Sequence, residues 1–255
     1  MIETEQLTKT FADKVAVAGL NLRVQPGEIF GFLGPNGAGK TTTVKMLTGM
    51  LQPTSGQARV AGFNIATDPV EVKKRIGYVP ETGALYESLT PAEYLELVAN
   101  LHHLDTDTAA ARIEELLDLF GVLAEKHQRM TEFSKGMKQK ILISAALINK
   151  PEVLFLDEPL NGIDANTAMI FKELLKKLAA QGKTIFFSSH ILEVVERICT
   201  RIVIINQGKP VIEGSAQEIS SATGCNTLEE AFCHLTGVRD AKQSTADFLA
   251  ALERE

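Results

Sequence analysis

Residues 34–41 read Gly34-Pro35-Asn36-Gly37-Ala38-Gly39-Lys40-Thr41. They match the phosphate-binding loop pattern G-x-x-x-x-G-K-[ST] at every fixed position. Glycines allow such a loop to curl until successive backbone N–H groups point at phosphate oxygens. The Lys40 ammonium can then reach the β- and γ-phosphates, and the Thr41 hydroxyl can ligate Mg²⁺. The loop therefore predicts a site for a nucleoside triphosphate and its magnesium ion.

The segments on either side of this loop fit a strand, a loop and a helix. Ile29–Leu33 is short and apolar, as expected of a buried parallel strand. Residues 42–50 predict a helix, so a bound phosphate would meet a helix N-terminus. A glycine-rich turn with an incidental lysine is the alternative, and this context argues against it. The candidate nucleotide-binding residues of the loop are Asn36, Gly37, Ala38, Gly39, Lys40, Thr41 and Thr42.

Composition limits the partners of the chain. Its 255 residues are 45% hydrophobic and 23% charged, which is typical of a globular protein with one large core or one core and a smaller subdomain. The formal net charge of −6 argues against direct binding to nucleic acid or to an anionic membrane.

Cys199, Cys225 and Cys233 lack metal-ligand spacing and predict free thiols in a reducing compartment. The N-terminal residues predict no secretory signal, and the longest apolar run, Ile141–Ile148, is too short to span a bilayer.

Strands and helices alternate along most of the chain, which predicts an α/β fold with a mainly parallel sheet covered on both faces. Residues 2–24 predict an antiparallel hairpin or meander ahead of that sheet. Residues 82–150 predict an all-helical insert, opened by a capping box at Thr90-Pro91-Ala92-Glu93. Further strands are expected near 58–61, 76–79, 153–156, 184–188 and 202–205, and helices at 166–180, at 191–198 and from about 215 onward, with a polar stretch near 238–246.

Two carboxylates follow one of the predicted strands. Asp157 and Glu158 come after the apolar run Val153–Leu156, and ligands bind at the carboxyl ends of parallel strands. Asp157 is therefore a candidate ligand of the Mg²⁺ that Thr41 would hold. Glu158 is a candidate to polarise the water that attacks the γ-phosphate. A core strand followed by solvated acids is the better interpretation of this segment alone, but the phosphate loop upstream favours the catalytic one.

Three further motifs carry a family resemblance. Phe133-Ser134-Lys135-Gly136-Met137, with Ser134 as a predicted N-cap, resembles the LSGGQ signature of the ATP-binding cassettes (ABC) of transporters. Leu160-Asn161-Gly162-Ile163-Asp164 resembles the D-loop of that family, and Ser188-Ser189-His190 resembles the segment that carries its switch histidine. The motifs stand in the family order, and the similarity covers roughly residues 1–220.

The resemblance implies a P-loop NTPase core (RecA-like, ABC-type) with an N-terminal antiparallel β subdomain. A helical subdomain would be inserted at about 82–150, and a short helical extension would occupy 221–255. It implies that Phe11 stacks on adenine, although a lone Phe is more often a core residue.

The same resemblance assigns roles to the signature, D-loop and histidine positions. Ser134 and Gly136 would hold the phosphates of ATP bound to a partner subunit, and His190 would sense the γ-phosphate. Asp164 would carry information across the dimer interface, and it could also cap the helix near 166.

The chain departs from the family pattern at two positions. Glu81 stands where the family usually has glutamine, and a carboxylate there can still ligate Mg²⁺ but adds negative charge beside a triphosphate. Lys135 replaces the usual first glycine of the signature, while Ser134 and Gly136 are kept.

The resemblance also implies what the chain does. It would bind and hydrolyse ATP with Mg²⁺, as a homodimer or as a heterodimer with another ABC ATPase subunit. It would power a membrane permease on a separate chain, docked near Glu81 and the helical insert, from the cytoplasmic face of the cell membrane. Tyr78-Val79-Pro80-Glu81, the Met-Lys-Gln that ends the signature, Thr227–Phe232 and Leu235-Thr236-Gly237 favour the ABC-2 exporter branch.

Two other classes are alternatives. A soluble ABC-type ATPase acting on ribosomes or nucleic acid usually fuses two cassettes or inserts a long coiled coil, and neither is visible here. A P-loop kinase or GTPase would not explain the signature and D-loop, and the sequence lacks an Asn-Lys-x-Asp guanine motif. The sequence does not identify the transported substrate.

Overall fold

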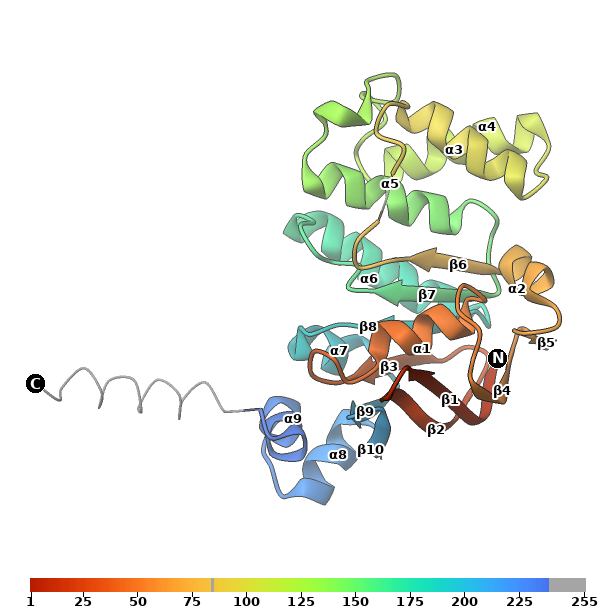
Figure 1. The fold of residues 1–255 in the computed structure, drawn as a ribbon. Coiled ribbons are helices and arrows are strands. Elements are labelled where there is room, and N and C mark those ends of the chain that lie inside the picture. The colour runs from red at the N-terminus through yellow and green to blue at the C-terminus, as the bar shows by residue number, and fades with distance from the viewer. Residues whose placement is uncertain (84, 239–255) are drawn as a thin grey trace, which may run out of the picture.

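A computed structural model describes residues 1–83 and 85–238 of the chain. Over these residues it has the α/β architecture that the strand and helix pattern predicts (Figure 1). A six-stranded sheet forms the centre, with a four-stranded antiparallel sheet on one side of it. Helices α3, α4 and α5 pack on one another beyond strand β6, at the top of Figure 1.

The bounds of the elements are as follows. The strands are β1 Ile2–Phe11, β2 Lys14–Val24, β3 Ile29–Leu33, β4 Ser55–Val60, β5 Phe63–Asn64, β6 Ile76–Val79, β7 Val153–Asp157, β8 Thr184–Ser188, β9 Arg201–Asn206 and β10 Lys209–Gly214. The helices are α1 Lys40–Leu47, α2 Pro69–Arg75, α3 Pro91–Leu101, α4 Thr106–Leu119, α5 Lys135–Leu147, α6 Ala165–Ala180, α7 Leu192–Ile198, α8 Ala216–Thr223 and α9 Leu228–Thr236, with a short 3₁₀ turn at Met130–Glu132.

The central sheet runs in the order β10-β9-β3-β8-β7-β6. All its pairings are parallel except that of β10 with β9, so the carboxyl ends of β3, β6, β7 and β8 meet at one edge. Every residue of β3, β7 and β8 is buried, as expected of strands covered on both faces. This edge receives the phosphate loop after β3 and the two carboxylates at the end of β7.

Successive residues of β3 enter two different hydrophobic cores. Ile29 and Leu33 pack in the core that includes α5, α6 and α7, whereas Phe30 and Phe32 pack in the core that includes α1 and the antiparallel sheet. The alternation follows from the period of two along a strand. Phe186 of β8 joins the second core, with its ring centroid 5.0 Å from that of Phe32. The phosphate loop is thus held by a strand that is fixed on both faces.

Two elements differ from the sequence-based expectation by more than one residue at an end. The strand expected at 58–61 occupies Ser55–Val60, where it pairs with β1. Helix α1 begins at Lys40 rather than at residue 42, and it ends at Leu47 because Gly49 turns the chain with a φ of 68°. Lys40 is therefore a helical, half-buried residue and not part of an exposed loop.

The C-terminal part of the described chain is helical, as expected, over α8 and α9. The polar stretch predicted near 238–246 lies outside the described residues except for residue 238. Within the described ranges, no helix is both long and apolar enough to cross a membrane.

Candidate active site

The phosphate loop needs its glycines because other backbone segments approach it closely. A Cβ at Gly39 would lie 2.4 Å from the carbonyl oxygen of Ala16, and a Cβ at Gly34 would lie 2.5 Å from that of Ile205. Gly39 also has a φ of 107°, a value that L side chains rarely adopt. Space beside Gly37 is open, with no atom within 4 Å of an added Cβ. The loop thus fits the tight backbone curl that its sequence predicts.

Lys40 lies at the first position of α1, next to the loop. Its Nζ donates hydrogen bonds to the carbonyl oxygens of Gly34, at 2.6 Å, and Pro35, at 3.2 Å. Burial lowers the pKa of Lys40, and the charges of Glu158 and Asp157 oppose this shift. The ammonium is therefore held over the loop by carbonyl groups, which a phosphate oxygen can replace as its hydrogen-bond acceptor.

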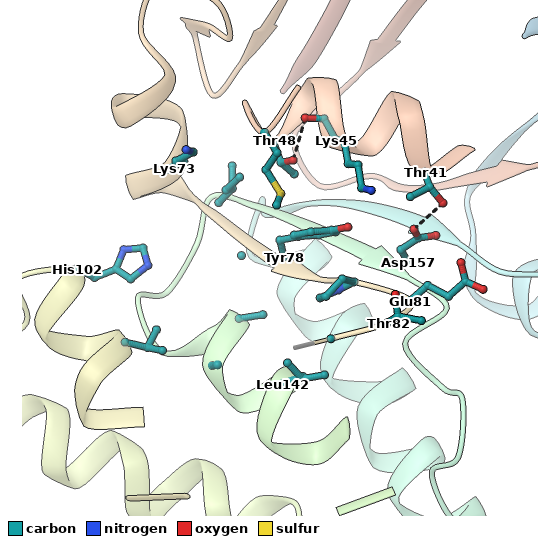
Figure 2. A pocket seen from close by; sticks show the side chains of 18 of the residues that line it. Thr41, Lys45, Thr48, Lys73, Tyr78, Glu81, Thr82, His102, Leu142 and Asp157 are labelled. Carbon is teal, nitrogen blue, oxygen red and sulfur yellow. Dashed lines mark hydrogen bonds between the residues drawn. The ribbon is translucent and has the colours of Figure 1, made fainter. Parts of the chain in front are cut away.

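Thr41 and Asp157 form the predicted metal-binding pair. The Thr41 hydroxyl donates to Oδ2 of Asp157 at 3.2 Å, as the dashed line in Figure 2 shows. Asp157 is only 1% exposed, and burial raises the pKa of its carboxyl, while the Thr41 hydroxyl acts in the opposite direction. Glu81, which follows β6, lies on the same side of the sheet in Figure 2. A hydroxyl and two carboxylates are the oxygen donors that Mg²⁺ takes beside phosphates, so these residues fit the ion.

Glu158 follows the end of β7 in an unusual backbone conformation. Its φ is 52°, in the left-handed region that non-glycine residues seldom occupy. Its Oε2 lies 2.8 Å from Nδ1 of His190 and accepts a hydrogen bond from the Ser189 hydroxyl at 3.2 Å. The Glu158 side chain is buried and that of His190 is 66% exposed. The structure thus brings the two predicted catalytic side chains into direct contact.

Most of the predicted residues line one cavity of about 750 Å³. The lining consists of Phe11, Lys14, Ala16, Asn36, Gly37, Gly39, Lys40, Thr41, Thr42, Glu81, Asp157, Glu158 and His190. Ala38 is absent from this lining because its side chain is buried in the core below the loop. Phe11 is 47% exposed, which excludes the core position that was its alternative.

Sequence reasoning missed three residues of this site. Lys14 and Ala16 line the cavity from β2, and Lys14 pairs with Phe11 across the hairpin. The turn between β1 and β2 could have indicated that pairing. Ser189 belongs to the Ser188-Ser189-His190 segment, and its contact with Glu158 has no signal in the sequence.

Ser134, Gly136 and Asp164 are not part of the cavity lining. Ser134 caps α5, as predicted, by accepting a hydrogen bond from the Met137 N–H. Asp164 caps α6 by accepting from the Thr167 N–H at 2.8 Å, and its pKa is lowered mainly by that bond. A Cβ at Gly136 would lie 2.4 Å from the carbonyl oxygen of Gly162, so the two motifs touch within one chain.

A second cavity, of about 680 Å³, adjoins the first and shares Thr41, Glu81 and Asp157 with it (Figure 2). Its other walls come from α1, β6, α3 and α5, so it lies between the central sheet and the helices of the insert. Tyr78 forms part of the floor, and burial raises its pKa to about 12. Met50 lies at this cavity with 61% exposure.

The fold and the site together define the class of protein. A parallel sheet with a G-x-x-x-x-G-K-[ST] loop between a strand and a helix, and a Thr–Asp pair beside it, is a P-loop NTPase. Residues 17–161 match the family described as ABC transporter. The chain therefore belongs to the ABC transporter family, and it is an ATP-binding ATPase of the cassette type.

Three relatives illustrate the likeness. An uncharacterised ABC transporter ATP-binding protein of Nostoc is 45% identical over 207 residues, which are 80% of this chain and 61% of that protein. The ABC transporter ATP-binding protein NatA of Bacillus subtilis is 37% identical, over 91% of this chain and 96% of NatA. A Nod factor export ATP-binding protein I of Burkholderia pseudomallei is 38% identical, over 89% and 75%.

Solved structures of ABC transporter subunits have the same fold as this chain. The ATP-binding subunit of an ABC transporter superposes with a TM-score of 0.87 at 31% identity, and the match covers 92% of this chain and 99% of that one. The dimeric structure of MJ0796, a bacterial ABC transporter cassette, superposes with a TM-score of 0.78 at 27% identity, over 84% and 98%.

Proposed function

We propose that this chain is the ATP-hydrolysing subunit of an ABC-2 type exporter. The observation that carries the proposal is the single cavity in which Lys40, the Thr41–Asp157 pair and the Glu158–His190 pair converge. Support for export comes from the name of the Burkholderia relative, which describes an export ATP-binding protein. The exported substrate would be bound by another chain.

The residues of the cavity have different roles in ATP binding and hydrolysis. Lys40 and the loop N–H groups bind the β- and γ-phosphates. Thr41, Asp157 and Glu81 would hold Mg²⁺, which supplies charge neutralisation between the phosphates when bound. Glu158 orients the attacking water and accepts its proton. His190, in contact with Oε2 of Glu158, positions the γ-phosphate.

Phe11 has a separate role at the mouth of the cavity. Its exposed ring stacks on adenine, and Lys14 lies beside it across the hairpin.

The complete site needs a second subunit. Ser134 and Gly136 begin α5 outside the lining of the cavity, where they would contact ATP bound to the partner subunit. Asp164 would face the same interface. A homodimer and a heterodimer with another ABC ATPase both satisfy this arrangement, and the dimeric MJ0796 cassette is a precedent for pairing.

The permease would dock on the second cavity, beside Glu81 and the helical insert, at the cytoplasmic face of the membrane. Met50, which is 61% exposed, lines this cavity, and Leu101 of α3, which is 71% exposed, directly precedes His102 of the lining. The proposal places the two proteins in contact through these apolar groups and α3.

A co-purification experiment tests the proposal. The tagged chain is expressed in a cell that contains its partners, and detergent-solubilised membranes are passed over the tag resin. A polytopic membrane protein is expected in the eluate, and Met50→Glu should reduce its yield. Met169→Glu is the matched control, because Met169 of α6 is 59% exposed and does not line the second cavity. Recovery of ribosomes or nucleic acid in place of a membrane protein would favour the soluble alternative.

A further inference from the structure

The backbone of Glu158 has a conformation that is unfavourable for a residue other than glycine. A φ of 52° in a non-glycine residue persists only where the surroundings impose it. The Glu158 N–H donates to the carbonyl oxygen of Ser188 at 2.9 Å, and its own carbonyl accepts from the Asn161 N–H at 3.3 Å. These bonds hold the peptides on both sides of Glu158, but they leave open the Pro159–Leu160 peptide that comes next along the chain.

Gln139 of α5 supplies a bond at that next peptide. Its Nε2 donates to the carbonyl oxygen of Pro159 at 3.1 Å, and the bond is buried. The Gln139 side chain is 6% exposed, which is rare for a glutamine and indicates a specific partner. Gln139 therefore reaches from the helical insert to the residue directly after Glu158.

Two further contacts tie the start of α5 to the loop formed by residues 159–164. Lys140 Nζ lies 3.0 Å from Oδ2 of Asp164, at the far end of that loop. Gly136 and Gly162 approach so closely that a Cβ at Gly136 would lie 2.4 Å from the Gly162 carbonyl oxygen. The first turns of α5 and residues 159–164 thus form one connected unit.

We infer that Gln139 is a positioning residue that couples the Ser134 end of α5 to the carboxylate of Glu158. The inference rests on the proposed function, in which Ser134 contacts the partner's nucleotide and Glu158 activates water. When α5 shifts on contact with that nucleotide, Gln139 moves the Pro159 peptide and with it the side chain of Glu158. Hydrolysis in one site then responds to occupancy of the other.

The coupling has a simple physical consequence for a variant without the amide. Without the Gln139 bond, the Pro159 carbonyl is left buried and unpaired, and the Glu158 backbone can relax toward a common φ. The carboxylate then leaves its place beside the attacking water. This route should leave nucleotide binding unaffected, because Gln139 is not among the residues that line the nucleotide cavity.

The first test replaces Gln139 with leucine, which removes the donor at similar volume. We expect kcat for ATP hydrolysis to fall roughly 10- to 100-fold, the usual effect of misplacing a reacting group, with KM unchanged. Ser144→Ala is the control: Ser144 is also buried on α5, but its hydroxyl bonds within the helix to the Lys140 carbonyl oxygen. Wild-type kcat in Gln139→Leu, or an equal loss in both variants, overturns the inference.

A second variant separates positioning from folding. Gln139→Glu can donate to Pro159 only when its carboxyl is protonated, so its kcat relative to the wild type should rise as pH falls. A role that does not use this hydrogen bond predicts no such pH dependence, so a flat ratio would overturn the inference even if Gln139→Leu does not fold.

A double-mutant cycle distinguishes this inference from the proposed function. In single-turnover measurements, Gln139→Leu should cause no further loss in a Glu158→Gln background, because it acts through that carboxylate. Additive losses would show that Gln139 acts by another route. A Glu158→Gln protein that hydrolyses ATP normally would instead refute the base assignment itself.

Discussion

Replacing Glu158 with glutamine tests the chemistry most directly. The exchange keeps the shape of a side chain that is almost fully buried, and it replaces one carboxylate oxygen with an amide nitrogen. The amide oxygen can still accept the Ser189 hydroxyl, which lies 3.2 Å from Oε2 in the native chain. The packing around the residue is therefore retained, while the proposed proton acceptor is lost.

The expected sizes of the loss in kcat and of the loss in stability follow from comparing two effects. Loss of a general base slows a reaction by about 10²- to 10⁴-fold, which corresponds to roughly 3–5 kcal/mol in the barrier. Weakening the contact with the His190 side chain adds little to the cost of the exchange, because the neutral amide leaves no buried charge without a partner. We therefore expect a folded protein with a strongly reduced kcat and with ATP affinity equal to or tighter than that of the wild type.

The assay measures phosphate release at saturating Mg²⁺ and ATP, together with gel filtration. The arrested variant should convert from monomer to dimer when Mg²⁺ and ATP are added, because the closed state accumulates. Glu81→Gln is a useful comparison, since it removes a neighbouring carboxylate of the same cavity and restores the usual family residue. Wild-type turnover in Glu158→Gln would refute the reasoning and make Glu81 the next candidate base.

Three other outcomes are expected. Lys40→Ala should weaken ATP binding by about 10- to 100-fold without unfolding, from the loss of charge-assisted bonds to phosphate, and calorimetric titration showing native affinity would contradict this. Burial raises the pKa of Asp157, so its charge destabilises the nucleotide-free fold above that pKa and the penalty disappears as pH falls through it. Asp157→Asn should therefore raise the Tm of the nucleotide-free protein at pH 7 by an amount that shrinks in acid, while it abolishes activation by Mg²⁺; an unchanged Tm would argue against a buried charge. Gly136→Ala should reduce ATPase activity even though alanine is small, because its Cβ would push the Gly162 carbonyl within the same chain; full activity would show that the two segments separate readily.

The sequence was sufficient for the parts of the site that are local in the chain. The phosphate loop, the caps at Ser134 and Asp164 and the two carboxylates at the end of β7 each depend on a few consecutive residues. Each of these patterns has one strong physical explanation, such as a helix N-terminus that needs an acceptor. These features could therefore be predicted from the sequence without any knowledge of the tertiary fold.

Contacts between segments that are distant in the chain could not be predicted from the sequence. The sheet places β3, which ends at Leu33, between β8 and β9, which begin at Thr184 and Arg201, and no local pattern specifies that order. The Glu158 backbone conformation and the bond from Gln139 to Pro159 likewise depend on contacts between segments that are distant in the chain. Such features arise when packing overrides the preference of a single residue, and two of them meet next to Glu158, the proposed base.

The charges that line the nucleotide cavity indicate what Glu81 does in the proposed metal site. Lys14 and Lys40 face the carboxylates of Glu81, Asp157 and Glu158, so acidic groups outnumber lysines there. A triphosphate adds more negative charge, and side-chain attraction alone would not bring it into the cavity. The loop N–H groups and the N-terminus of α1 attract phosphate, and a divalent cation has to neutralise the remainder. Because Glu81 replaces an uncharged glutamine of the family pattern, it increases that requirement, so this departure should alter the metal dependence of ATP binding more than the chemistry at Glu158.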